Sequence, residues 1–114
     1  MDSTQSCGRI SGTVLTGANS ANLDITAAGA YLEYRSVLKI LVSSDQSVTL
    51  TVKLGRAEDS ISSLPHTLTE SVTGGTTLMV VIPVVPGIMA ARIYLANASG
   101  STATYTVDAG VEEC

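Results

Sequence analysis

The chain has 114 residues, of which 45% are hydrophobic and 14% charged, and its formal net charge is −4. This length fits one domain, and the six basic residues are scattered, so the chain lacks the basic patch that nucleic-acid phosphates require. No apolar run reaches the length of about 18 residues that a membrane helix needs. We therefore expect neither nucleic acid nor a membrane as a partner.

The charged fraction is low, because a typical soluble domain has about 25% charged residues. Phe and Trp are absent, while Ser and Thr together make up about a quarter of the chain. Hydroxyl and aliphatic groups must therefore cover much of the surface, and such a surface has little charge repulsion to keep copies apart. This favours assembly into a homo-oligomer, for which a trimer is one arrangement; a weakly charged monomer is the alternative.

Apolar residues alternate with polar ones between turn clusters along most of the chain, which is typical of half-buried strands. The pattern predicts strands over 9–16, 22–27, 31–42, 48–54, 64–72, 77–82, 90–96 and 102–108. No amphipathic helix of useful length is predicted, and 55–63 is expected to be a loop or a helical turn. About eight short strands at regular spacing indicate an all-β fold, an antiparallel β-sandwich of the jelly-roll or Ig-like type.

Two of the connections between strands predict hairpins. The turn at 43–46 separates the two clearest alternating runs, and the pair Gly74–Gly75 precedes another strand. In the strand at 77–82 both faces are apolar, so we expect both to be covered. The turn at 97–101 begins with Asn97-Ala98-Ser99, which matches a glycosylation sequon but is interpreted here as a turn. Tyr94 and Tyr105 are expected to lie on neighbouring strands.

We expect a single domain over 1–114, with an N-terminal arm at 1–8 and an acidic C-terminal tail at 110–114. The two cysteines, Cys7 and Cys114, lie near the two ends of the chain. Three states remain open for them: a disulfide within the chain, two free thiols, or links between chains. Their spacing excludes a CxxC metal or redox motif.

The sequence contains no recognisable catalytic or metal-binding motif. Its single histidine, His66, is expected to be an exposed loop residue, and Glu58 and Asp59 a solvated part of a loop. There is no nucleophile-elbow motif and no EF-hand spacing. We therefore expect no enzymatic activity, no metal and no cofactor.

Three segments between Leu38 and Ala109 resemble accessory β-sandwich proteins of phage and virus particles: LKILVSSDQSVTLTV, GGTTLMVVIPV and ARIYLANASGSTATYTV. The resemblance covers about two-thirds of the chain and implies a β-sandwich with a structural role, but no binding residue is carried over. The chain departs from that pattern in its few aromatic residues, since such domains often place Phe or Trp in the core.

The resemblance and the composition together predict a non-catalytic virion structural protein. It would be a capsid decoration or cement protein, or a small tail or fibre component, that binds further copies of itself and a major capsid or other virion protein. The N-terminal segment MDSTQSCGRISG lacks the basic and apolar regions of a signal peptide, so synthesis in the host cytoplasm and display on the virion surface are expected. The alternative is a carbohydrate-binding or adhesin-like module.

The expected interaction face is rich in hydroxyl groups. Two of the predicted strands, 48–54 and 102–108, each present one apolar and one threonine-rich face. The residues predicted to form the interaction surface are Thr49, Thr51, Lys53, Thr102, Thr104 and Thr106.

Overall fold

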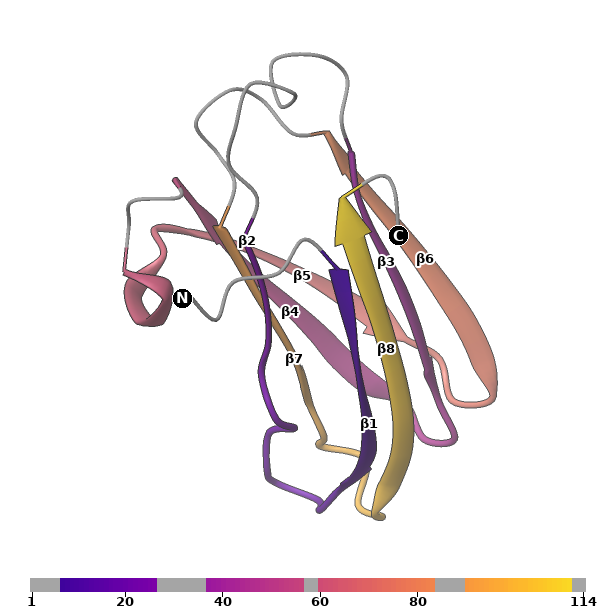
Figure 1. Cartoon of the computed structure of the whole chain (residues 1–114). Helices are drawn as coiled ribbons and strands as arrows, with labels where there is room; N and C mark the ends of the chain where they lie inside the picture. The colour runs from indigo at the N-terminus through magenta and orange to yellow at the C-terminus, as the bar shows by residue number, and fades with distance from the viewer. Residues whose placement is uncertain (1–6, 27–36, 57–59, 84–89, 112–114) are drawn as a thin grey trace.

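The computed structural model describes residues 7–26, 37–56, 60–83 and 90–111, and shows an all-β sandwich of antiparallel strands (Figure 1). The predicted fold class is therefore confirmed. In chain order the elements are β1 (Cys7–Val14), β2 (Leu23–Thr26), β3 (Val37–Ser44), β4 (Val48–Gly55), the 3₁₀ turn η2 (Ile61–Ser63), β5 (His66–Val72), β6 (Thr76–Pro83), β7 (Ala90–Ala96) and β8 (Ala103–Val111).

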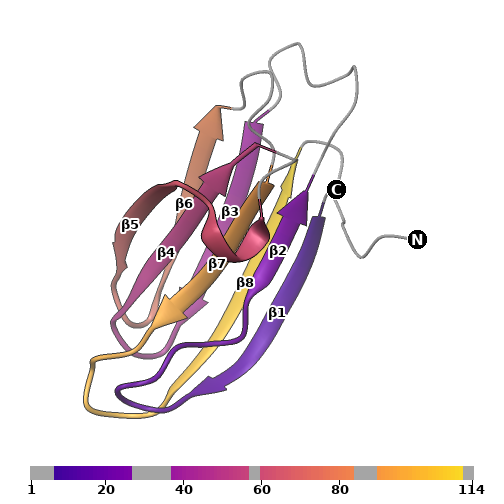
Figure 2. The same cartoon turned by 90° about the vertical axis from the view of Figure 1, so that its left-hand side faces the viewer.

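The strands form two four-stranded sheets, which Figure 2 shows stacked on each other. We call sheet A the one with the order β1-β8-β3-β6, and sheet B the one with the order β2-β7-β4-β5. The first strand thus pairs with the last, the second with the seventh, the third with the sixth and the fourth with the fifth. This order is that of a jelly roll, the first of the two sandwich topologies that the sequence left open.

The core lies between the sheets and consists of aliphatic side chains from both. On β3 the residues Leu38, Ile40 and Val42 point inward, and on β4 Val48, Leu50 and Val52 do so; all six are at most 4% exposed. Among the described residues, Tyr105 is the only aromatic residue in the core. Branched aliphatic residues can fill such a core because they pack well between pleated surfaces.

Both predicted hairpins are wrong, because the strands on either side of each turn lie in different sheets. β3 belongs to sheet A and β4 to sheet B, and β5 and β6 are separated in the same way. An apolar face shows only that a strand borders the core, and both sheets border the same core. The two crossing connections lie side by side, since the Gly75 N–H donates to the Ser44 carbonyl oxygen at 2.8 Å.

Gly74 is required where these connections meet. A Cβ atom on this residue would lie 2.9 Å from the carbonyl carbon and 3.0 Å from the Cα of Gln46. Its N–H donates to the Ser47 hydroxyl oxygen at 3.1 Å. The double glycine therefore serves close backbone approach between two sheet-crossing connections, and not a tight hairpin.

The ends of the fold extend further than the sequence predicts. β1 begins at Cys7 and β8 continues to Val111, so Cys7 and Gly8 belong to a strand and not to an N-terminal arm, and 110–111 belong to β8. Cys7 takes part in a disulfide bond. Cys114 is the only other cysteine of the chain, and it lies outside the described residues.

Candidate interaction surface

The outer face of sheet A carries the most exposed apolar surface of the β-strands described here. Leu41 on β3 is 42% exposed, and Met79 and Val81 on β6 are 63% and 50% exposed. We call these three side chains the apolar patch. Leu41 lies directly opposite Met79, and Val81 lies opposite Lys39, so the pairing of β3 with β6 brings the patch together.

Side chains on this face form rows that cross all four strands. One row runs Arg9, Asp108, Leu41, Met79, and the next runs Cys7, Gly110, Lys39, Val81. A third row contains only hydroxyl side chains: Ser11, Thr106, Ser43 and Thr77. The face is therefore divided into an apolar and charged half and a hydroxyl half.

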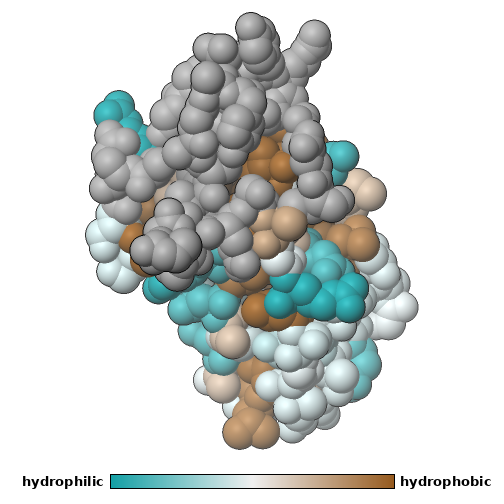
Figure 3. Space-filling model, viewed as in Figure 1, coloured by the Kyte–Doolittle hydropathy of each residue, from teal (hydrophilic) through white to brown (hydrophobic). Residues whose placement is uncertain are grey.

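The apolar half is hollowed. A depression of about 550 Å³ lies on this face between β1, β8, β3 and β6, and Met79 and Leu41 line it together with Lys39 and the Arg9–Asp108 pair. Its surface is low at Gly110, which lies on the outer face of β8 and has no side chain to raise it. Figure 3 shows hydrophobic residues interspersed with hydrophilic ones on the side of the molecule seen in Figure 1.

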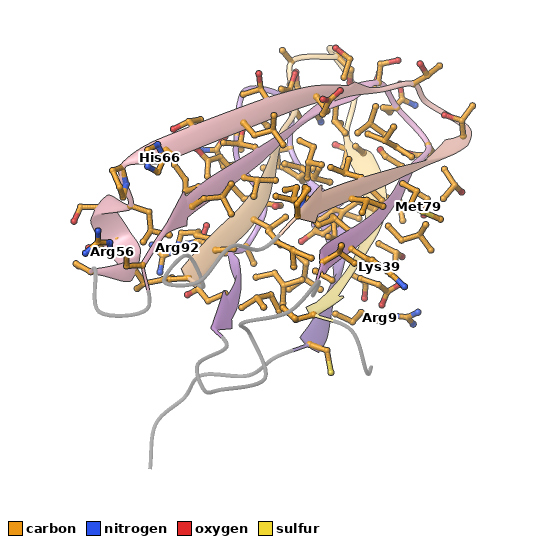
Figure 4. All side chains as sticks on the ribbon, turned by 90° about the horizontal axis from the view of Figure 1, so that it is seen from above. Arg9, Lys39, Arg56, His66, Met79 and Arg92 are labelled. Atoms are coloured by element: carbon orange, nitrogen blue, oxygen red, sulfur yellow. The ribbon has the colours of Figure 1, made fainter. Side chains whose placement is uncertain are left out.

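Two cations border the apolar patch. The guanidinium of Arg9 donates two hydrogen bonds to Asp108, at 2.6 Å from Nε and 3.1 Å from Nη2. These hydrogen bonds and the charge of Asp108 raise the pKa of Arg9. Lys39 is exposed and makes no ion pair within the part of the chain that the structure describes. Figure 4 shows Arg9, Lys39 and Met79 along one side of the sandwich.

The outer face of sheet B has a different chemistry. A smaller hollow, of about 280 Å³, is lined by polar and aromatic groups, among them Asn19, Asn22, Lys53, Arg92 and Tyr94. Arg92 donates to both carboxylate oxygens of Asp24, at 2.8 and 2.9 Å, across the β2–β7 pair. This hydrogen bonding raises the pKa of Arg92 and outweighs the effect of partial burial, which lowers it.

The structure divides the predicted hydroxyl face between the two sheets. Thr49, Thr51 and Lys53 lie on the outer face of β4 in sheet B, whereas Thr104 and Thr106 lie on the outer face of β8 in sheet A and Thr102 just precedes that strand. The six residues therefore form no single surface. Thr51 is only 8% exposed, between its cross-strand neighbours Thr69 and Tyr94.

The other candidate residues are spread over the molecule. His66 is exposed at the start of β5 on the edge of sheet B, and Glu58 and Asp59 lie outside the described residues. Tyr94 faces outward from sheet B whereas Tyr105 is buried under sheet A, so the two are not on neighbouring strands.

Within the described ranges, no three His, Cys, Asp or Glu side chains gather to hold a metal ion, and no helix is long and apolar enough to cross a membrane.

Sequence reasoning missed the apolar patch. It identified apolar residues on both faces of the strand at 77–82 and predicted that both would be covered. Leu78, Val80 and Ile82 do pack partly against the core, but Met79 and Val81 are exposed. The apolar character of Met79 and Val81 can be read from the sequence, but only the structure shows that these side chains are exposed. Together with Leu41 they form a candidate binding surface, since contiguous exposed apolar patches mark interaction sites.

No model of a known protein family matches this chain, and no curated protein matches it either.

Proposed function

We propose that the protein is a non-catalytic structural component of a virus particle, of the capsid decoration, cement or small tail and fibre kind. The observation that carries the proposal is the apolar patch on the outer face of sheet A. A solvent-exposed Leu, Met and Val beside a hollow of about 550 Å³ are suited to docking against another protein. Jelly rolls recur in viral capsid domains, and that supports the same role.

In this proposal the protein acts through surface contacts and not through a pocket with reactive groups. The apolar patch would bind the major capsid protein or another virion protein, and Lys39 at its border would orient the contact by pairing with an acidic group. Copies of the chain would also contact one another in a symmetric assembly. Display on the virion surface after synthesis in the host cytoplasm belongs to the same proposal.

Replacing Leu41 with lysine should abolish binding to particles, because it puts a charge in the middle of the apolar patch. The test is co-sedimentation with empty particles built from the major capsid protein of the same genome. Leu41 lies on β3, away from the sheet edges, so the substitution leaves strand pairing intact. Thr69→Lys, at an exposed position on the outer face of sheet B, is the matched control and should bind like the wild type.

Wild-type protein that never co-sediments with the particles would contradict the proposal. Equal loss of binding in both lysine variants would place the contact outside the apolar patch. Circular dichroism of each variant verifies that its fold is retained.

A second candidate, a carbohydrate-binding module, is favoured by the hollow on sheet B. Its lining combines the Tyr94 ring, the side chains of Asn19 and Asn22 and two cations, and rings with amides and charged groups are what glycan sites use to stack and hydrogen-bond sugars. A glycan array should then show binding that Tyr94→Ala reduces at least tenfold, while Thr67→Ala on the same face leaves it unchanged. An array without a single reproducible signal would rule this candidate out.

A further inference from the structure

The edges of the two sheets differ in how they are protected from pairing with other chains. Sheet A ends in β1 and β6, and sheet B in β2 and β5. An exposed sheet edge is a template for another strand, and charged side chains or short strands are the usual protection. β1 carries Arg9, β2 is only four residues long and carries Asp24, and β5 carries His66 and Glu70.

β6 has none of these protections. Its eight residues, TTLMVVIP, include no charged side chain, and its only proline is the last of them. Every residue of β6 is exposed or half-buried, although Leu78, Val80 and Ile82 point toward the core. The strand pairs with β3 along one edge, and its other edge has no paired strand among the described residues. The inner side chains of β6 are therefore only partly covered, although they border the core.

We propose that β6 pairs with β6 of a second copy of this chain, in antiparallel orientation about a two-fold axis perpendicular to sheet A. The inference rests on the proposed structural role and specifies which surface joins two copies. The two sheets A would become one continuous eight-stranded sheet, and the two apolar patches would meet across the axis. The half-buried inner side chains of β6 would then be covered in both copies.

The sequence of β6 selects the register. Residues opposite each other in an antiparallel pair lie on the same face, so outward-facing residues must oppose outward-facing ones. Centring the pair on Val80 places Val80 opposite itself, Met79 opposite Val81 and Leu78 opposite Ile82. Every position from 78 to 82 then has an apolar partner, and no charge is buried or opposed. A shift to Met79 as the centre would instead place Thr77 opposite Val81 and Thr76 opposite Ile82. This self-complementarity is the reason for choosing a second copy over a foreign strand.

Cysteine cross-linking tests the register. Directly opposite residues have Cα atoms about 4.5 to 5.5 Å apart, within the range of a disulfide. Val80→Cys should therefore form a covalent dimer under mild oxidation. Val81→Cys is the control: in this register its two copies are about 8 Å apart, which is too far for a disulfide. Val81 is more exposed than Val80, so random collisions between copies would cross-link V81C more readily than V80C. Stronger cross-linking of V80C therefore indicates specific pairing.

Charge substitutions test the pairing without cross-linking. In M79K/V81K, each lysine faces a lysine of the other copy, whereas in M79K/V81E each lysine faces a glutamate. The dimer dissociation constant, measured by analytical ultracentrifugation, should be at least tenfold higher for M79K/V81K than for M79K/V81E. The lysine pair also reduces the net negative charge of the chain, so a weaker dimer cannot come from overall repulsion. Circular dichroism checks that both variants fold.

Each outcome decides the proposal. A dimer in which V80C fails to cross-link overturns the Val80-centred pairing, and one in which both charge variants associate equally shows that copies meet at another surface; self-assembly as such then stands. A wild-type chain that stays monomeric at high concentration overturns the β6 pairing, and a bound foreign strand at this edge would do the same. Particle binding through Leu41 is measured separately and does not depend on either result.

Discussion

Replacing Asn97 with aspartate is expected to lower the free energy of unfolding by about 3 to 5 kcal/mol, because it removes two buried hydrogen-bond donors and introduces a buried charge. Asn97 is 2% exposed and follows the end of β7. Its Nδ2 donates to the carbonyl oxygen of Val14 at 2.9 Å and to that of Ser101 at 2.7 Å. Its Oδ1 accepts from the N–H of Ser99 at 2.9 Å. One side chain thus connects the end of β1 with the turn before β8.

The aspartate has nearly the same shape but cannot donate from an ionised oxygen, so two carbonyl oxygens would face a negative charge. Urea denaturation of Asn97→Asp measures the loss. Asn22→Asp makes the same chemical change at an exposed position and should alter stability by no more than about 0.5 kcal/mol. Equal stability of the two variants would contradict the role assigned to Asn97. The burial of this side chain also argues against glycosylation at Asn97 in the folded protein.

Truncating Leu50 to alanine should cost about 3 to 5 kcal/mol, through lost apolar burial and the cavity that remains. Leu50 lies in the middle of β4, is 0% exposed and pairs with Leu95 of β7 and Glu70 of β5. β4 is an interior strand of sheet B, paired on both sides, so its backbone has little freedom to move into the cavity. The core has no Phe or Trp side chain that could swing into the space.

Thr49→Ala is the matched control for Leu50→Ala, because Thr49 is the preceding residue of the same strand and points outward to solvent. Its stability should stay within about 0.5 kcal/mol of the wild type. Thermal or urea unfolding of both variants gives the comparison. A cost for Thr49→Ala as large as that for Leu50→Ala would mean that the faces of β4 are assigned the wrong way round.

The sequence predicted most of the described strands and their buried faces. Predicted strands at 48–54 and 90–96 correspond to β4 and β7 almost residue for residue, because period-two alternation follows directly from the pleat of a half-buried strand. The first half of the strand predicted at 31–42 lies outside the described residues, and its second half is in β3. The 3₁₀ turn at 61–63 agrees with the loop or helical turn expected there.

The candidate surface was less predictable from the sequence. Met79 and Val81 were identified as apolar, but whether an apolar residue is covered depends on what lies against the strand, and β6 is an edge strand. Asn97 was interpreted as an ordinary turn residue, since nothing local shows that the end of β1 supplies a carbonyl oxygen 83 positions away in the chain. Both features depend on contacts between segments that are distant in sequence.

Alternation and turn residues by themselves indicated an all-β sandwich and, for clearly alternating strands such as β4 and β8, which side of the strand meets the core. They could not assign a strand to a sheet, because a strand with one apolar face can cover the core equally well from either sheet. Only the tertiary structure decided that β3 and β4, and β5 and β6, lie in opposite sheets. The same assignment separated the threonines of β4 from those of β8 and left the uncharged strand β6 at an edge of sheet A.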